Sequence, residues 1–201
     1  ISLQLPLPPH LQTSSCIQTI DPKKDVDGFH PMNMGKLLLG EKDGFIPCTP
    51  LGIQMLLDHY SIDTRGKNVV IVGRSNLVGK PMAALLMQPG KGGDATVTIA
   101  HRQSQDLSLH CQRADILIVA VGSAKLIQPH MVKEGAIVID VGINMQEKAP
   151  HSTKTQIVGD VDFLKVAPKC SWITPVPGGI GPMTIAMLLQ NTWLAYQQCC
   201  P

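Results

Sequence analysis

Four short runs of apolar, mostly β-branched residues recur along the middle of the chain, separated by stretches typical of helices or turns. The runs are residues 69–72, 95–100, 116–121 and 136–141. The intervening stretches are expected helices near 78–88 and 104–113 and a shorter link near 128–134. Short apolar runs without polar alternation indicate strands that are buried on both faces. Strands that alternate with helices predict an α/β fold with a parallel, doubly wound sheet.

The two ends of the chain differ from this middle part. Residues 1–48 are rich in Pro, Gly and Asp, and we expect a strand at 1–5, a short helix near 12–19 and a long loop. Because these elements cannot bury a core alone, we interpret them as the tail of a preceding domain. A helix then begins with Thr49 as its N-cap. The last helix begins near Pro182, and one face of it carries Ile185, Leu188, Leu189, Thr192, Trp193 and Tyr196.

The composition excludes several classes of protein. Lys and Arg number 17 against 15 Asp and Glu, and 3% of residues are aromatic, so we expect neither a nucleic-acid-binding surface nor a membrane partner. The six cysteines form no C-x-x-C pair and the seven histidines show no ligand spacing, so we expect reduced thiols and no metal site. No membrane span or signal peptide is visible, which favours the cytoplasm and leaves a mitochondrial location open.

The loop after the first run resembles a dinucleotide-binding loop in its glycine spacing. Gly73 and Gly79 flank it, and Ser75 stands where G-x-G-x-x-G has its second glycine. The loop follows an expected strand and opens an expected helix, whose N-terminus offers N–H groups and a positive dipole end to a phosphate. This context favours a dinucleotide site, and a sheet of the Rossmann type, over an ordinary strand–helix turn.

Positive charge follows the first two strands, where a carboxylate would be expected to hold an unmodified ribose. Arg74 lies in the glycine loop, and His101 and Arg102 follow the second strand. Two guanidinium groups near the adenosine ribose suit a 2′-phosphate, so we predict NADP, with NAD as the alternative. The structural interpretation of Arg102, as a solvated surface group, has equal weight.

Three other segments allow a functional and a structural interpretation. Residues 21–29 carry three carboxylates, of which one could accept two hydrogen bonds from an amidine-like ligand edge, although a solvated turn is favoured. The run Pro177–Gly181 is either a flexible connector or a backbone that approaches a flat ligand closely. Cys48 is interpreted as a buried thiol and not as a nucleophile, because no partner His or Asn can be identified for it.

These phrases occur together in one protein family. The matching phrases are Gln4–Pro8, Lys24–Phe29, Pro47–Pro50, Gly73–Pro81 and Thr174–Thr184, and Val138–Asn144 and Val158–Phe163 fit as well. Over almost its whole length the chain resembles bifunctional methylenetetrahydrofolate dehydrogenase/methenyltetrahydrofolate cyclohydrolase. The resemblance implies NADP-dependent oxidation of 5,10-methylenetetrahydrofolate to the methenyl compound, and hydrolysis of that product to 10-formyltetrahydrofolate.

The resemblance also implies a domain organisation. Residues 1–48 would be the end of an N-terminal α/β catalytic domain that binds folate, and 49–180 would be the NAD(P)-binding Rossmann domain. Residues 181–201 would form a helix that packs back onto the catalytic domain. Tetrahydrofolate derivatives would bind in the cleft between the domains, and the subunits would pair as a homodimer through the Rossmann domain.

Individual residues acquire roles through the same resemblance. Gln4 and Asp27 would be the catalytic Gln and Asp of the active site. The folate site would be lined by Leu3, Gln4, Leu5, Asp27, Pro177, Gly178, Gly179, Ile180, Gly181, Pro182, Met183, Thr184 and Ile185. The dinucleotide would be contacted by Gly73, Arg74, Ser75, Gly79, Arg102 and Ile143.

The chain departs from the family pattern at the catalytic Tyr and Lys, which the family spaces as Y-x-x-x-K ahead of the Gln-Leu-Pro-Leu-Pro phrase. Tyr60 and Tyr196 are followed four residues later by Thr64 and Cys200, so neither fits. We therefore expect part of the catalytic domain to lie upstream of Ile1. A truncated, non-catalytic dinucleotide-binding module or pseudoenzyme subunit is the alternative to an active enzyme.

Overall fold

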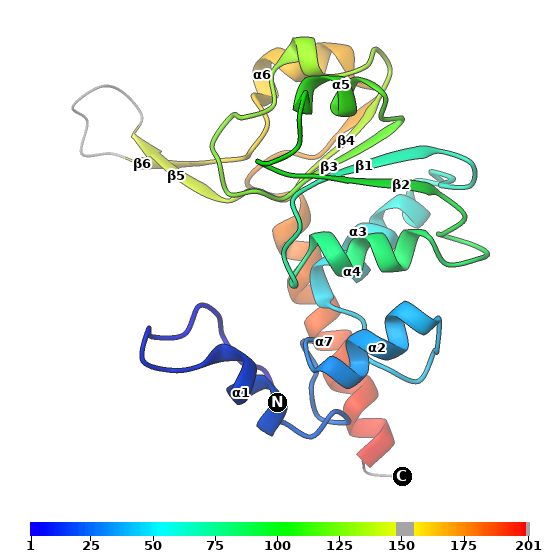
Figure 1. Cartoon of the computed structure of the whole chain (residues 1–201), viewed down its shortest axis with the longest axis vertical. Coiled ribbons are helices and arrows are strands. Elements are labelled where there is room, and N and C mark those ends of the chain that lie inside the picture. Colours follow the sequence, from blue (N-terminus) through cyan, green and yellow to red (C-terminus); the bar gives the residue numbers. More distant parts are fainter. Residues whose placement is uncertain (148–154, 200–201) are drawn as a thin grey trace.

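A computed structural model of the chain describes residues 1–147 and 155–199. Its centre is a five-stranded sheet in the order β2-β1-β3-β4-β7, in which all neighbouring strands are parallel (Figure 1). The strands are β1 (Asn68–Val72), β2 (Thr96–Ala100), β3 (Ile116–Val119), β4 (Ile137–Asp140) and β7 (Trp172–Ile173). The predicted parallel, doubly wound α/β sheet is confirmed.

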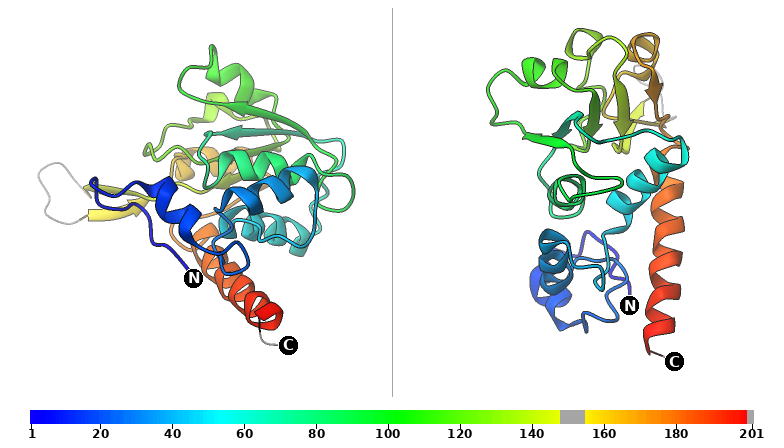
Figure 2. Two further views of the ribbon diagram at one scale, coloured as in Figure 1. Left: turned by 60° about the horizontal axis from the view of Figure 1, so that its bottom comes forward. Right: turned by 90° about the vertical axis from the view of Figure 1, so that its right-hand side faces the viewer.

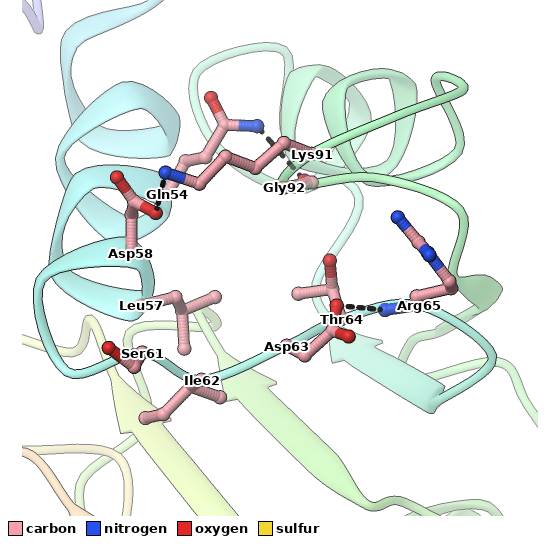
Figure 3. A pocket seen from close by; sticks show the side chains of 10 residues that line it. All are labelled: Gln54, Leu57, Asp58, Ser61, Ile62, Asp63, Thr64, Arg65, Lys91 and Gly92. Atoms are coloured by element: carbon pink, nitrogen blue, oxygen red, sulfur yellow. Dashed lines mark hydrogen bonds and ion pairs between the residues drawn. The ribbon is translucent and has the colours of Figure 1, made fainter.

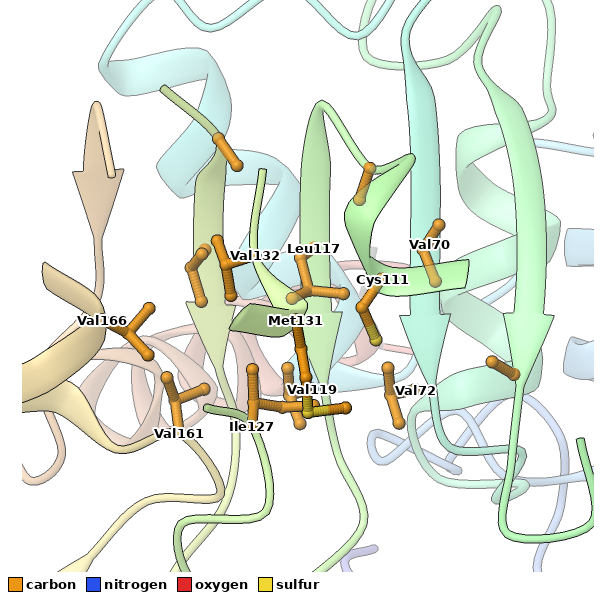
Figure 4. Close-up of a cluster of buried hydrophobic side chains, with 14 residues drawn as sticks. Val70, Val72, Cys111, Leu117, Val119, Ile127, Met131, Val132, Val161 and Val166 are labelled. Carbon is orange, nitrogen blue, oxygen red and sulfur yellow. The ribbon is translucent and has the colours of Figure 1, made fainter. Parts of the chain in front are cut away.

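Helices cover both faces of the sheet because β1 and β3 are apolar on both sides. Val69 and Ile71 point to the face that is covered by α3 (Cys48–His59) and α4 (Gly79–Leu86). Val70 and Val72 point to the opposite cluster, which Figure 4 shows between the sheet and the second helical layer. That layer comprises α5 (Leu107–Gln112), η1 (Pro129–Met131), α6 (Phe163–Val166) and η2 (Ala167–Lys169). Each fully buried Val or Ile stabilises this arrangement by about 1.5–3 kcal/mol.

A two-stranded antiparallel ribbon extends from the carboxyl edge of the sheet (Figures 1 and 2). It consists of β5 (Asn144–Glu147) and β6 (Thr155–Val158), and Met145 is 68% exposed on it. The ribbon begins after residues 141–143, which follow β4, and it ends directly before residues 159–162, which run alongside the loop that follows β3. Both ends of the ribbon are therefore fixed to the same edge of the sheet.

The N-terminal region contains α1 (Thr13–Thr19) and α2 (Pro31–Leu39) but no strand in its first residues. The prediction of a strand at 1–5 is wrong. The backbone N–H of Val26 donates to the carbonyl of Ile1, and the N–H of Leu3 donates to the carboxylate of Asp27 at 2.7 Å. A side chain thus takes the place of the partner strand that a ladder of backbone hydrogen bonds would need.

The long helix α7 (Ile180–Cys199) joins the sheet to the N-terminal region, and Figure 2 shows it running past both. Its buried positions are Ile180, Met187, Asn191 and Ala195. The predicted apolar face is largely exposed, with Leu189 at 67% and Trp193 at 60%. Ala195 packs in one cluster with Val26 and Phe45 of the N-terminal region, and this packing decides which face is buried.

Two helix starts also differ from prediction. Helix α3 begins at Cys48 with Pro47 as its N-cap, so Thr49 lies inside the first turn. The Thr49 hydroxyl lies 2.9 Å from the hydroxyl of Thr184 on α7, which ties the two helices together. Helix α7 begins at Ile180, two residues before the predicted Pro182.

Candidate functional site

The glycine loop after β1 packs so closely on its neighbours that side chains are excluded at two positions. Gly73 has φ +128°, and a Cβ there would collide with the carbonyl oxygen of Ala120 after β3. A Cβ on Gly79, the first residue of α4, would collide with the carbonyl oxygen of Gly73. Both glycines therefore serve the close approach of strand, loop and helix that a phosphate-binding turn needs.

Ser75, at the position of the second glycine of the motif, shapes the same loop through its own side chain. Its Oγ accepts a hydrogen bond from the N–H of Val78 at 3.1 Å, and its carbonyl accepts from the N–H of Lys80 at 3.0 Å. The loop thus turns directly into α4, whose N-terminus points toward the carboxyl edge of the sheet. An anion at this edge is favoured by the helix dipole.

Positive groups gather at the ends of β1 and β2. The guanidinium Nη1 of Arg74 lies 3.4 Å from Nε2 of His101, and Arg102 is exposed beside them. Nδ1 of His101 faces the backbone N–H of Gln103 at 3.3 Å and so acts as an acceptor. With Nδ1 as the acceptor, Nε2 of the ring is a donor, and it faces the guanidinium donor of Arg74. An anion beside these two nitrogens would accept a hydrogen bond from each of them. Within residues 1–147 and 155–199, none of these three side chains forms an ion pair with a carboxylate.

A cleft of about 530 Å³ opens between the carboxyl end of β4 and the start of α7. Its walls are largely apolar. From β4 and the ribbon they include Asp140, Val141, Gly142, Ile143 and Ile157, and from the Pro/Gly segment and α7 they include Pro175–Pro182, Thr184 and Ile185. The segment Pro177–Gly181, for which the sequence allowed either a flexible connector or a backbone that approaches a ligand, forms one wall of this cleft. An apolar cleft with a backbone-lined wall suits a flat ligand.

The cleft is lined by the buried carboxylate of Asp140, which the sequence pattern alone did not identify as a site residue. Asp140 is 3% exposed and accepts hydrogen bonds from the N–H groups of Gly142, Asp160 and Val161 at 2.9–3.0 Å. Burial raises the pKa of Asp140, and these backbone donors act in the opposite direction. The available signal was an acidic residue at the end of an apolar run followed closely by glycine, as in Asp140-Val141-Gly142.

Comparison with known proteins decides the family. The model of the tetrahydrofolate dehydrogenase/cyclohydrolase NAD(P)-binding domain matches residues 47–200. The chain belongs to this family.

Relatives of this tetrahydrofolate dehydrogenase/cyclohydrolase chain include proteins described as bifunctional protein FolD. That of Protochlamydia amoebophila is 60% identical over 198 residues, which are 98% of this chain and 68% of the relative. That of Sulfurovum sp. is 56% identical over 198 residues, which are 98% of this chain and 66% of the relative. The chain thus spans about two thirds of the length of these relatives.

Solved structures of the family have the same fold. The FolD crystal structure from Campylobacter jejuni superposes with a TM-score of 0.90 at 52% identity and covers 98% of this chain and 66% of that one. The Trypanosoma brucei structure, complexed with NADP cofactor and inhibitor, superposes with a TM-score of 0.89 at 37% identity, with the same coverage.

The N-terminal candidates of this family member lie outside the lining of the cleft. The half-buried carboxylate of Asp27 accepts hydrogen bonds from the Ser2 hydroxyl at 3.0 Å and from the N–H of Leu3 at 2.7 Å. Gln4 is exposed, and its Nε2 donates to the carbonyl of Leu5 at 3.3 Å. Asp27 thus fixes the backbone that carries Gln4, so the two predicted catalytic residues are neighbours.

The remaining predicted residues divide between two sides of the Pro/Gly segment. Ile143 is 68% exposed at the rim of the 530 Å³ cleft. Met183 instead lines an apolar hollow of about 360 Å³ between α3, β7 and the Pro/Gly segment. Its side chain and backbone pack against Gly52 of α3, so its place is between the helices.

A hollow of about 420 Å³ at the opposite edge of the sheet has a different character (Figure 3). It lies where the chain enters β1 and β2, and its charged groups are engaged locally: Lys91 pairs with Asp58 at 2.6 Å, and Asp63 accepts from the N–H of Arg65 at 3.0 Å. Ligands of doubly wound sheets bind at the carboxyl ends of the strands. The candidate site is therefore the 530 Å³ cleft together with the glycine loop.

Other chemistry has little support in the described part of the chain. Cys48 is buried, as predicted, and burial raises the pKa of its thiol to about 11. Among residues 1–147 and 155–199, no group of three or more His, Cys, Asp or Glu residues could hold a metal ion. In the same residues, no helix is both long and apolar enough to cross a membrane.

Proposed function

We propose that the chain forms the dinucleotide site and one wall of the folate site of a bifunctional enzyme. The enzyme would oxidise 5,10-methylenetetrahydrofolate with NADP and hydrolyse the methenyl product to 10-formyltetrahydrofolate. One observation carries the proposal: the phosphate loop Gly73–Gly79 and the cleft lined by Pro175–Pro182 open at the same edge of the sheet. A dinucleotide that lies across this edge reaches from one to the other.

NADP is favoured over NAD by the charges at the ends of β1 and β2. The 3.4 Å approach of Arg74 to His101 places two donors around a position that a 2′-phosphate would fill. Arg102 adds a further positive charge beside them. The description of the T. brucei relative as an NADP complex supports the same choice.

The folate half of the proposal rests on the cleft and on Asp27. The apolar walls from Ile143, Pro177–Pro182 and Ile185 suit a flat pterin ring. Each oxygen of the Asp27 carboxylate has acceptor capacity beyond its bond to Ser2 or Leu3, so the group can receive the two parallel donors of a pterin edge. Gln4, held next to this carboxylate, would orient the reacting part of the substrate.

The chain's own residues provide binding and orientation, and they exclude water from the apolar cleft. When bound, NADP supplies the hydride acceptor. The family resemblance implies a Tyr and a Lys, spaced Y-x-x-x-K, for proton transfer, and neither Tyr60 nor Tyr196 has a lysine four residues on. Loss of a positioned proton-transfer group costs roughly 10²–10⁴-fold in rate. We therefore propose that this chain binds dinucleotide more effectively than it catalyses, unless another segment or chain provides the Tyr and Lys.

Two exposed apolar surfaces would be covered in the functional assembly. The outward face of α7, with Ile185, Leu189 and Trp193 each at least 60% exposed, would pack against the remainder of the catalytic domain. The β5–β6 ribbon, which exposes Met145, would contribute to a homodimer through the NAD(P)-binding domain. An isolated two-stranded ribbon is marginally stable in water, which favours a partner there.

The test is a pair of measurements on the purified chain. Calorimetric titration should show saturable binding of NADP that is tighter than that of NAD. Assays of dehydrogenase and cyclohydrolase turnover with methylene- and methenyltetrahydrofolate should give rates far below those of a full-length FolD relative. No binding of either dinucleotide would refute the proposed site, and turnover equal to that of the relative would refute the proposed dependence on a further segment.

A further inference from the structure

Asp160 occupies the point where three segments of the carboxyl edge meet, and its side chain is fully buried. Its Oδ2 accepts hydrogen bonds from the N–H groups of Val121 at 2.7 Å and Gly122 at 2.9 Å. Its Oδ1 accepts from the N–H of Ser123 at 2.8 Å and from Nδ2 of Asn144 at 2.8 Å. One carboxylate therefore joins the loop after β3 to the first residue of the ribbon.

The arrangement requires a group that only accepts hydrogen bonds. Four donors converge on two oxygens, and an amide in the same place would present its NH₂ either to two backbone N–H groups or to one N–H and the Asn144 amide. The space is also closed, because a Cβ on Gly142 would collide with the carboxylate of Asp160. An isosteric Asp160→Asn change thus alters the hydrogen bonding while leaving the volume almost unchanged.

The segments that Asp160 joins lie on the side of the site away from the adenosine-binding charges. Arg74 and His101 follow β1 and β2, whereas residues 121–123 follow β3 and residues 141–144 follow β4. In the sheet order β2-β1-β3-β4-β7, a dinucleotide with its adenosine at β2 and β1 extends its other half over β3 and β4. Val141, Gly142 and Ile143 line the cleft at that end.

We propose that Asp160 is a positioning residue for the nicotinamide half of the dinucleotide: it fixes the loops after β3 and β4 without touching the ligand. This inference rests on the proposed function, since it assumes that NADP binds across the carboxyl edge. The inference divides the affinity for NADP into two parts. The adenosine half depends on Arg74 and the glycine loop, and the nicotinamide half depends on the geometry that Asp160 maintains.

The experiment compares NADP with 2′,5′-ADP, which contains only the adenosine half with its 2′-phosphate. In Asp160→Asn, the Kd of NADP should rise about tenfold or more, whereas that of 2′,5′-ADP should stay within about twofold of the wild-type value. The matched control is Asp162→Asn. Asp162 is also buried, with 7% of its surface exposed, but its carboxylate pairs with Lys165 on α6 at 2.9 Å. Its contact with the segment after β3 is the backbone hydrogen bond from its N–H to the carbonyl of Ile127, which the substitution leaves in place, so both affinities should be retained.

The outcomes separate the inference from the proposed function. A wild-type chain that binds neither ligand refutes the proposed function itself. Equal weakening of both ligands in Asp160→Asn, or weakening of neither, overturns the inference, because a general loss of structure does not distinguish the two halves. Circular dichroism and thermal unfolding monitor the fold of each variant.

Asn144→Ala provides a second test if Asp160→Asn does not fold. It removes one of the four donors and leaves three backbone donors on the carboxylate. The Kd of NADP should then rise about threefold with no change for 2′,5′-ADP. An unchanged Kd of NADP in a folded Asn144→Ala protein overturns the inference.

Discussion

Arg74→Ala should weaken the binding of NADP far more than that of NAD. The guanidinium of Arg74 is exposed and contacts the side chain of His101 at 3.4 Å. The folded structure therefore depends little on the guanidinium. A hydrogen bond from a charged donor to a phosphate contributes about 1.5–3 kcal/mol, and solvent screening at an exposed site favours the lower end. A loss of about 1.5–2 kcal/mol corresponds to a Kd for NADP that is roughly 10–30 times higher.

Calorimetric titrations of wild type and variant with NADP and NAD measure this difference. The Kd of NAD should change by less than about threefold, because NAD has no 2′-phosphate for Arg74 to contact. Raising the salt concentration should reduce the difference between the Kd values of NADP for the wild type and for Arg74→Ala, since exposed charges are screened. Arg65→Ala is the matched control, because Arg65 is an exposed arginine at the opposite edge of the sheet (Figure 3). Equal weakening of NADP and NAD would refute the assignment.

Three further predictions concern stability and reactivity. Asn191→Ala removes the side-chain donor to two carbonyls of the N-terminal region, so it should lower the free energy of unfolding in urea by about 2–4 kcal/mol. Thr192 is exposed, and Thr192→Ala should change this free energy by less than about 0.5 kcal/mol. Gly79→Ala forces the loop and α4 apart, and should cost about 1–3 kcal/mol and abolish saturable NADP binding at concentrations that saturate the wild type. At pH 8, iodoacetamide should modify the exposed Cys199 and spare Cys48 in the native protein, as peptide mass spectrometry would show. The folded pKa of Cys48 is raised from 9.0 to about 11. The contribution of this buried thiol to the free energy of unfolding is therefore present below pH 9 and is lost as the pH rises toward 11.

The sheet and the phosphate loop could be predicted from the sequence because their signals are local. Runs such as Val69–Val72 are apolar at every position, so any fold must cover both of their faces. Gly73 and Gly79 mark a turn in which a side chain would collide with backbone, and that requirement is visible as spacing within seven residues. The predicted roles of Gln4 and Asp27 have a different basis, because they come from family resemblance and remain predictions.

The α7 helix shows where local signals fail. Its sequence is apolar around most of its circumference, so the helical period does not select the buried stripe. The apolar face identified in the sequence is exposed at Leu189 and Trp193, and the buried stripe runs instead through Met187, Asn191 and Ala195. The strand predicted at 1–5 failed for a similar reason, since its hydrogen-bond partner is the Asp27 side chain, 24 residues away from Leu3.

The sequence by itself determined the α/β class, the alternation of β1 to β4 with the helices between them, the glycine loop and the positive charges that follow β1 and β2. Only the tertiary structure decided which groups meet: the amide of Asn191 with the carbonyl of Val26, 165 residues apart, and the carboxylate of Asp160 with the loop after β3. The physical reason is that apolar periodicity and glycine placement act within one turn or strand. The hydrogen-bond partners of a buried polar group are instead supplied by whichever segments the folded chain brings beside it, and these segments can be far away in the sequence.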